Sequence, residues 1–145
     1  MGLEAINFFF TLKEPIKKVI ESNFKIKKFD DERYVFLEEG LFWIDIKLQN
    51  EFTISIRITL CNPIDSILNA LDNLLLFLFS FEYPVLYNLN TKEVFKSYNE
   101  YAKKQIIESY MNRKKTFESM YGDYSAAVSS EEFYRIQRSN RGIEE

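Results

Sequence analysis

The residue types that most often carry catalysis are scarce in this chain. Its 145 residues include no histidine, which is the commonest general base and the commonest ligand of transition metals. The lack of histidine excludes Ser–His–Asp and Cys–His mechanisms and argues against a zinc site. The four glycines are too sparse for a phosphate-binding or dinucleotide-binding loop. We therefore expect a protein that is not an enzyme and that has no cofactor and no metal ion.

Two kinds of residue keep some capacity for chemistry, a lone cysteine and two acidic clusters. Cys61 precedes an expected helix start, where the helix dipole favours a thiolate, but it also follows a strongly apolar strand, which favours a buried structural thiol. The acidic clusters lie at 30–32 and 38–39. Such carboxylates can serve a hydrolase or a magnesium site, yet acidic residues at hairpin turns are usually turn formers. We expect both features to be structural.

Composition narrows the class of protein further. Hydrophobic content of 46% and charged content of 28% are ordinary for a globular protein of this length. A net charge of −3 argues against a dedicated nucleic-acid binder, which usually carries a basic excess. The lone cysteine and the lack of a basic segment before the first apolar patch favour a reducing, cytoplasmic setting. We expect a single domain over 1–145 with a frayed tail over 139–145.

The chain is organised around its longest apolar stretch, at 62–83. Asn62 is a good helix N-cap and Pro63 suits the first helical position, so the spacing of the leucines predicts a buried helix over about 63–82. Its uncharged run is too short to span a membrane. Leu76 and Phe77 lie off the main apolar stripe. We expect them to form a dimer surface or to pack against another helix.

The segments around this stretch predict an α+β fold. An apolar arm at 2–12 should dock on the body, and a short helix should follow it. Four strands come next, at about 24–27, 34–37, 41–48 and 52–60, and their short connections predict an antiparallel meander that packs on the central helix. Two short strands are expected at 85–89 and 93–95. A long helix over about 98–121 and a short terminal helix complete the fold.

The expected strand registers gather the most function-like residues on one face. A turn centred on Asn50 places Trp43 opposite Arg57, and a turn at 39–40 places Phe36 next to Trp43. The outer face then carries Lys25, Lys27, Tyr34, Phe36, Trp43, Asp45, Lys47, Ser55 and Arg57. Trp, Tyr and Arg are enriched at binding hot spots, so this face is the candidate binding surface. The apolar arm or the C-terminal helices could instead cover it, which would make it part of the core.

Three classes of function remain open. We expect a non-catalytic module that binds another protein stoichiometrically, with a homodimer as a second form of association. Size, acidic charge and an α+β layout are shared with toxin-neutralising immunity proteins and secretion chaperones, which is an analogy of layout and not a motif match. The alternatives are a single-stranded nucleic-acid binder that uses the lysine and aromatic face, and a carboxylate-dependent enzyme. The expected partner-binding residues are Lys25, Lys27, Tyr34, Phe36, Trp43, Asp45 and Arg57.

Overall fold

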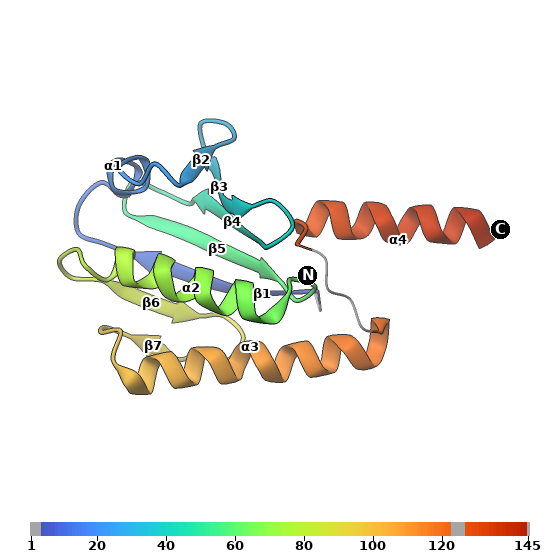
Figure 1. Cartoon of the computed structure of the whole chain (residues 1–145). Coiled ribbons are helices and arrows are strands. Elements are labelled where there is room, and N and C mark those ends of the chain that lie inside the picture. The colour runs from blue at the N-terminus through green and yellow to red at the C-terminus, as the bar shows by residue number, and fades with distance from the viewer. Residues whose placement is uncertain (1–3, 123–126, 145) are drawn as a thin grey trace.

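The computed structural model describes residues 4–122 and 127–144, and a seven-stranded antiparallel sheet is its framework (Figure 1). The strands are β1 (Ala5–Thr11), β2 (Ile26–Lys28), β3 (Arg33–Glu38), β4 (Phe42–Leu48), β5 (Thr53–Thr59), β6 (Val85–Asn88) and β7 (Val94–Phe95). The helices are α1 (Ile16–Glu21), α2 (Ile64–Leu78), α3 (Glu100–Tyr121) and α4 (Ser130–Glu144). The order of the strands in the sheet is β2-β3-β4-β5-β1-β6-β7. The predicted α+β fold, the four-stranded meander and the two short later strands are confirmed.

The N-terminal arm lies inside the sheet. As β1 it pairs with β5 on one side and with β6 on the other. Phe8 and Phe10 are fully buried on one face of the sheet, and Phe9 lies half-buried on the other. The arm therefore docks as expected, but as a central strand whose hydrogen bonds join the meander to β6 and β7.

One face of the sheet carries the hydrophobic core. Ile54, Ile56 and Ile58 of β5 alternate into this face, as the period of two in the sequence predicts. The buried side chains of α1, α2 and α3 join the same apolar cluster, and Figure 1 shows α2 lying across the sheet with α3 along the side of β6 and β7. We call this the core face and the opposite one the outer face.

The register of β3 differs from the expected one by one residue. Phe36 pairs with Ile44, and Leu37 pairs with Trp43. The connection is three residues long and contains Gly40, which has a φ of +78° in the left-handed region that glycine tolerates. Because side chains alternate, this shift moves Tyr34 and Phe36 to the core face, where both are buried. Their predicted place on the outer face is wrong.

The β4–β5 hairpin differs by two residues, which keeps every side chain on its expected face. Ile46 pairs with Ile56, and Asp45 pairs with Arg57. The expected pairing of Trp43 with Arg57 is therefore wrong. The turn is wider than predicted, since the N–H groups of Gln49 and Asn50 both donate to the carbonyl of Thr53, at 2.9 and 3.3 Å.

The central helix begins near the predicted place but ends earlier. It spans Ile64–Leu78, and the N–H of Phe79 closes it on the carbonyl of Leu75 at 2.9 Å. Asn62 does not cap it. The fully buried Asn62 side chain instead accepts a hydrogen bond from the Trp43 N–H at 2.9 Å and donates to the carbonyl of Thr59 at 2.8 Å. It joins the start of β4 to the end of β5.

The long helix α3 contributes to the same apolar cluster as α2. Asn99 caps it by accepting from the N–H of Ala102 at 2.8 Å, and it ends before Gly122, which has a φ of +86°. Its expected apolar residues Ala102, Ile106, Tyr110 and Phe117 are buried in the core.

Three other side chains of the long helices differ in their burial. On α3, Lys114 is buried, and its Nζ donates to the carbonyls of Leu60 at 2.6 Å and Asn62 at 3.2 Å. On α2, Leu76 is 49% exposed, whereas Phe77 is half-buried and packs edge-on against Phe81. Leu76 and Phe77 therefore do not form one continuous surface, because Leu76 faces solvent and Phe77 packs against the core.

Helix α4 is capped by Ser129, whose Oγ accepts from the N–H of Glu132 at 3.1 Å. It extends away from the sheet (Figure 1). The backbone is helical as far as Glu144, and residue 145 lies outside the described part of the chain. The frayed tail over 139–145 and the single domain over 1–145 stay predictions.

Candidate functional site

The outer face centres on Trp43 and Asp45 of β4 and Arg57 of β5, all three of which are half-buried. Trp43 and Asp45 are two residues apart on one strand, so their side chains share this face, and Trp43 Nε1 donates to Asp45 Oδ1 at 2.9 Å. Arg57 lies directly opposite Asp45 across the ladder. This arrangement brings an indole, a carboxylate and a guanidinium together on the outer face.

The carboxyl of Asp45 is affected by this environment. Burial raises the pKa of its carboxyl above the usual value, because the charged form loses hydration there. The hydrogen bond from Trp43 and the positive charge of Arg57 lower that pKa in part, while the negative charge of Glu131 on α4 raises it. Asp45 therefore responds to charge that arrives from α4 or from a bound molecule.

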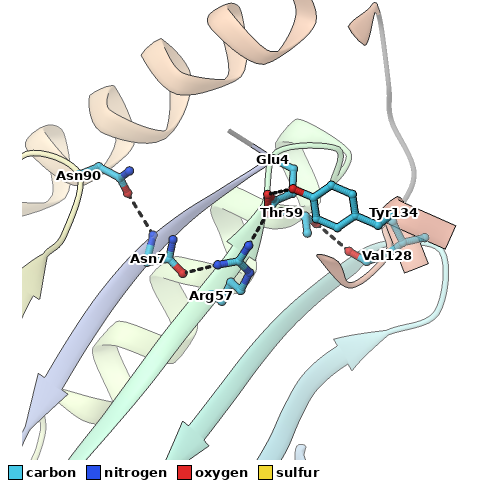
Figure 2. A network of polar contacts seen from close by, with 7 residues as sticks. All are labelled: Glu4, Asn7, Arg57, Thr59, Asn90, Val128 and Tyr134. Carbon is cyan, nitrogen blue, oxygen red and sulfur yellow. Dashed lines mark hydrogen bonds and ion pairs between the residues drawn. The ribbon is translucent and has the colours of Figure 1, made fainter. Parts of the chain in front are cut away.

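Arg57 belongs to a polar network that sequence reasoning missed (Figure 2). Its guanidinium donates to Asn7 Oδ1 at 3.0 Å and forms a short ion pair with Glu4, whose side chain is 1% exposed. Tyr134 of α4 donates from its hydroxyl to the other oxygen of Glu4 at 2.7 Å. A buried carboxylate is costly unless it is paired, so this network holds β1, β5 and α4 together.

The start of α4 is fixed to the outer face by further contacts. Thr59 Oγ1 donates to the carbonyl of Val128 at 2.6 Å. Phe133 is fully buried, and its ring packs against Phe117 and Tyr121 of α3 at centroid distances of 5.5 Å. The hydrogen bond to Glu4 raises the pKa of the Tyr134 hydroxyl, with burial adding to the effect. The first turns of α4 are thus part of the site.

A groove lies between these first turns and the outer face. Its larger part has a volume of about 500 Å³, and a neighbouring part of about 260 Å³ extends towards Arg57. The two parts share Arg33, Asp45 and Glu131, so we treat them as one feature, the outer groove. Its larger part is lined by Lys27, Lys28, Phe29, Arg33, Tyr34, Val35, Leu37, Trp43, Asp45, Ser129, Glu131, Glu132 and Arg135.

A second cavity of about 350 Å³ opens beside the same edge of the sheet, towards α2. We call it the edge notch. It is lined by Phe24, Lys25, Lys27, Phe36, Leu37, Glu38, Phe42, Asn69, Ala70 and Asn73. Lys27 and Leu37 line both this notch and the outer groove, so the two cavities meet at the β2–β3 edge.

The structure divides the predicted binding residues among these features. Trp43, Asp45, Arg57 and Lys27 lie at the outer groove, and Lys25 lies at the edge notch. The side chain of Phe36 is buried between the notch and the core, and Tyr34 points to the core side, where its hydroxyl donates to Glu21 of α1 at 2.7 Å. The binding role of all seven residues stays a prediction.

Several contributors to the groove lay outside the predicted set, among them Phe29, Arg33 and Glu131. Arg33 lies over the ring of Phe29 at 4.5 Å from the centroid and pairs with Asp30 at 2.7 Å, and this pairing lowers the pKa of the Asp30 carboxyl. Glu131 comes from α4. Phe29 and Arg33 flank a polar turn, and this sequence pattern could have predicted them as groove residues. Glu131 reaches the groove only because α4 packs near the outer face, which no local pattern predicts.

The candidate chemical groups are structural in their geometry. Asp30 accepts from the N–H groups of Glu32 at 3.0 Å and Arg33 at 2.9 Å, which is the turn chemistry expected of it. Cys61 is fully buried, and burial raises the pKa of its thiol. Within residues 4–122 and 127–144, no group of three or more acidic or thiol side chains could hold a metal ion.

Comparison with known proteins assigns no family or function. No family model, curated protein or solved structure matches the chain. Among the described residues, no helix has the length and apolar character that crossing a membrane requires. The outer groove and the edge notch are therefore the features of the molecule that indicate a function.

Proposed function

We propose that this protein is a non-catalytic, cytoplasmic binding module that acts by stoichiometric association with another protein, in the manner of an inhibitor or a chaperone. The observation that carries the proposal is the position of Trp43, half-buried at the floor of the outer groove. Tryptophan is one of the residues enriched at binding hot spots, which cluster in desolvated pockets of protein interfaces.

The lining of the groove has the layout of a protein interface. Val35, Leu37 and Trp43 form an apolar floor, with Arg33 and Glu131 among the charged groups around it. An apolar centre inside a charged rim is the usual anatomy of a protein-binding patch. Both signs of charge are present, and Asp45 and Glu131 would repel a phosphate backbone, so a partner protein fits better than a nucleic acid.

Capture and reconstitution of the partner test this proposal. Tagged protein is used to isolate a partner from lysate of cells that naturally produce it, and the partner is then purified and titrated calorimetrically. We expect one-to-one binding that Trp43→Ala or Phe29→Ala weakens by about tenfold or more, because an anchor is lost. Leu76→Ala is the matched control, since it removes a half-exposed leucine from α2, away from the groove.

Three results would contradict the proposed function. The first is a purified partner that binds wild type and Trp43→Ala with equal affinity, once circular dichroism shows that the variant is folded. The second is salt-sensitive binding of single-stranded oligonucleotides in place of any protein. The third is self-association as the sole interaction, measured by light scattering, which would assign the surface to a homodimer.

A further inference from the structure

The strand β2 is at the edge of the sheet, and it presents free backbone groups there. Among the described residues no strand lies beyond it. The N–H of Phe29 donates to the carbonyl of Arg33 at 2.8 Å, so by the alternation of an antiparallel ladder Lys27 is hydrogen-bonded to Val35. The N–H and C=O of Lys28 therefore point away from β3, towards the open edge.

Two phenylalanines flank this edge in unusually exposed positions. Phe24 is 84% exposed and Phe29 is 69% exposed. Edge strands are normally protected by charge, and the three lysines of the segment do that in part. The two exposed aromatic rings have the opposite effect, because apolar surface in contact with water favours association. They therefore indicate that this edge is a contact surface.

Cavities lie on both sides of the edge, which is the arrangement an added strand requires. The edge notch opens towards α2 and the outer groove towards α4. Successive side chains of a strand point to opposite faces of a sheet, so a strand added beside β2 would send alternate side chains into the two cavities. The β2–β3 ladder stops at Ile26 and Phe36, so nothing from β2 lies opposite Leu37, which lines both cavities.

The charge of the edge indicates the chemistry of the occupant. The segment 24–29 has the sequence FKIKKF, with three lysines and no acidic residue. Lys28 makes exposed ion pairs with Glu21 at 3.8 Å and Asp31 at 3.6 Å. Within the described residues Lys25 and Lys27 make no ion pair. Acidic side chains would complement these lysines, and apolar ones would fill the outer groove, with its Val35, Leu37 and Trp43, and cover the exposed rings.

We propose that β2 is a docking edge to which an extended segment of a partner protein, rich in acidic and apolar residues, adds as a further β-strand. Main-chain hydrogen bonds to Lys28 supply affinity, and the two cavities select alternate side chains. This inference rests on the proposed function and names the chemistry of the partner and its mode of binding.

A proline at the edge tests strand addition without disturbing the fold. Lys28→Pro removes an outward-pointing N–H, which an edge strand tolerates, and its ring blocks an incoming strand. Lys28→Ala is the paired variant that removes the charge and keeps the N–H. Val94→Pro is the matched control at the opposite edge, because the Asn88 N–H to Glu93 bond at 2.9 Å places the N–H of Val94 outward in the same way.

The probe is a phage-displayed library of random linear peptides selected on the wild-type protein, followed by fluorescence anisotropy of the enriched peptides. We expect the enriched sequences to alternate acidic and apolar residues. Their affinity should fall at least about tenfold in Lys28→Pro, only severalfold in Lys28→Ala, and not at all in Val94→Pro. Binding should weaken with added salt, since exposed lysines contribute to it.

Several outcomes overturn this inference. One is a selection that yields no peptide distinguishing wild type from Lys28→Pro, and another is enrichment of basic peptides. A dimer that forms in light scattering and is lost in Lys28→Pro would show that the occupant is a second copy of this chain. A purified partner that requires Trp43 but binds Lys28→Pro normally would overturn the docking edge alone and leave the proposed function standing.

Discussion

The two faces of the sheet are built from the same strands but are stabilised in different ways. On the core face β1 presents Phe8 and Phe10, which are buried under helices. On the outer face the same strand presents Asn7 and Phe9, which are half-buried. The core face excludes water with apolar side chains. The outer face, where the start of α4 packs near one end, holds its charges by pairing Glu4 with Arg57 and Tyr134.

This difference has energetic consequences. Burial of apolar surface is non-directional and additive over many contacts, so a residue of the core face contributes in proportion to the area it buries. A paired charge contributes little net free energy, but removal of one partner leaves the other unsatisfied. We therefore expect losses on the core face to act through volume and losses on the outer face to act through polar groups left without partners.

The largest expected effect is a difference in the free energy of unfolding between substitutions at two neighbouring residues of β1. Phe8→Ala should lower the free energy of unfolding by about 3–5 kcal/mol, because it leaves a cavity in the core. Phe9→Ala, on the half-buried outer face, should cost about 1–2 kcal/mol, since less apolar area is lost there. Urea denaturation of both variants measures the difference. Equal losses would contradict the distinction between the faces.

The next effect concerns the polar network. Glu4→Gln keeps the size of the side chain but removes the charge that Arg57 and Tyr134 bind, and it should cost about 2 kcal/mol, the scale of a hydrogen bond to a charged group. Backbone amides at the start of α4 should also exchange faster with deuterium. Glu132→Gln is the control, because it breaks the exposed pair with Arg135 instead. Unchanged exchange in α4 would show that Glu4 does not anchor this helix.

The smallest expected effect is a pH dependence at Asp45. Its folded-state pKa is raised by burial above the ordinary value of 3.8, so the folded protein binds this proton more tightly than the unfolded chain does. The resulting stabilisation is present below pH 3.8 and is lost as the pH rises through the folded-state pKa. Asp45→Asn is the reference, because it keeps an acceptor for Trp43 but does not titrate. The free energy of unfolding of wild type, relative to this variant, should fall as the pH rises from 3.8 through the folded-state pKa of Asp45. A difference that stays constant with pH would contradict the assignment.

Local patterns were sufficient wherever neighbours in sequence decide the structure. The alternation at Ile54, Ile56 and Ile58 assigned β5 to one buried face, and the stripe of leucines predicted α2. The same reasoning predicted the wrong faces for β3, because the length of the connection to β4 differs from the expected one. The three-residue connection around Gly40, in place of two, changes the parity of the pairing, and Tyr34 and Phe36 consequently turn into the core.

The sequence by itself determined the fold class, the presence of the helices, the inward faces of β4 and β5 and the presence of an aromatic and basic cluster, because these follow from periodicity and from turns a few residues long. Only the tertiary structure decided that the N-terminal arm is a central strand, since Phe8 pairs with Ile56 and with Asn88. It also decided that Glu4 is buried. The partners of Glu4 lie 53 and 130 residues away along the chain, and no local pattern records a pairing that exists only after the chain has folded back.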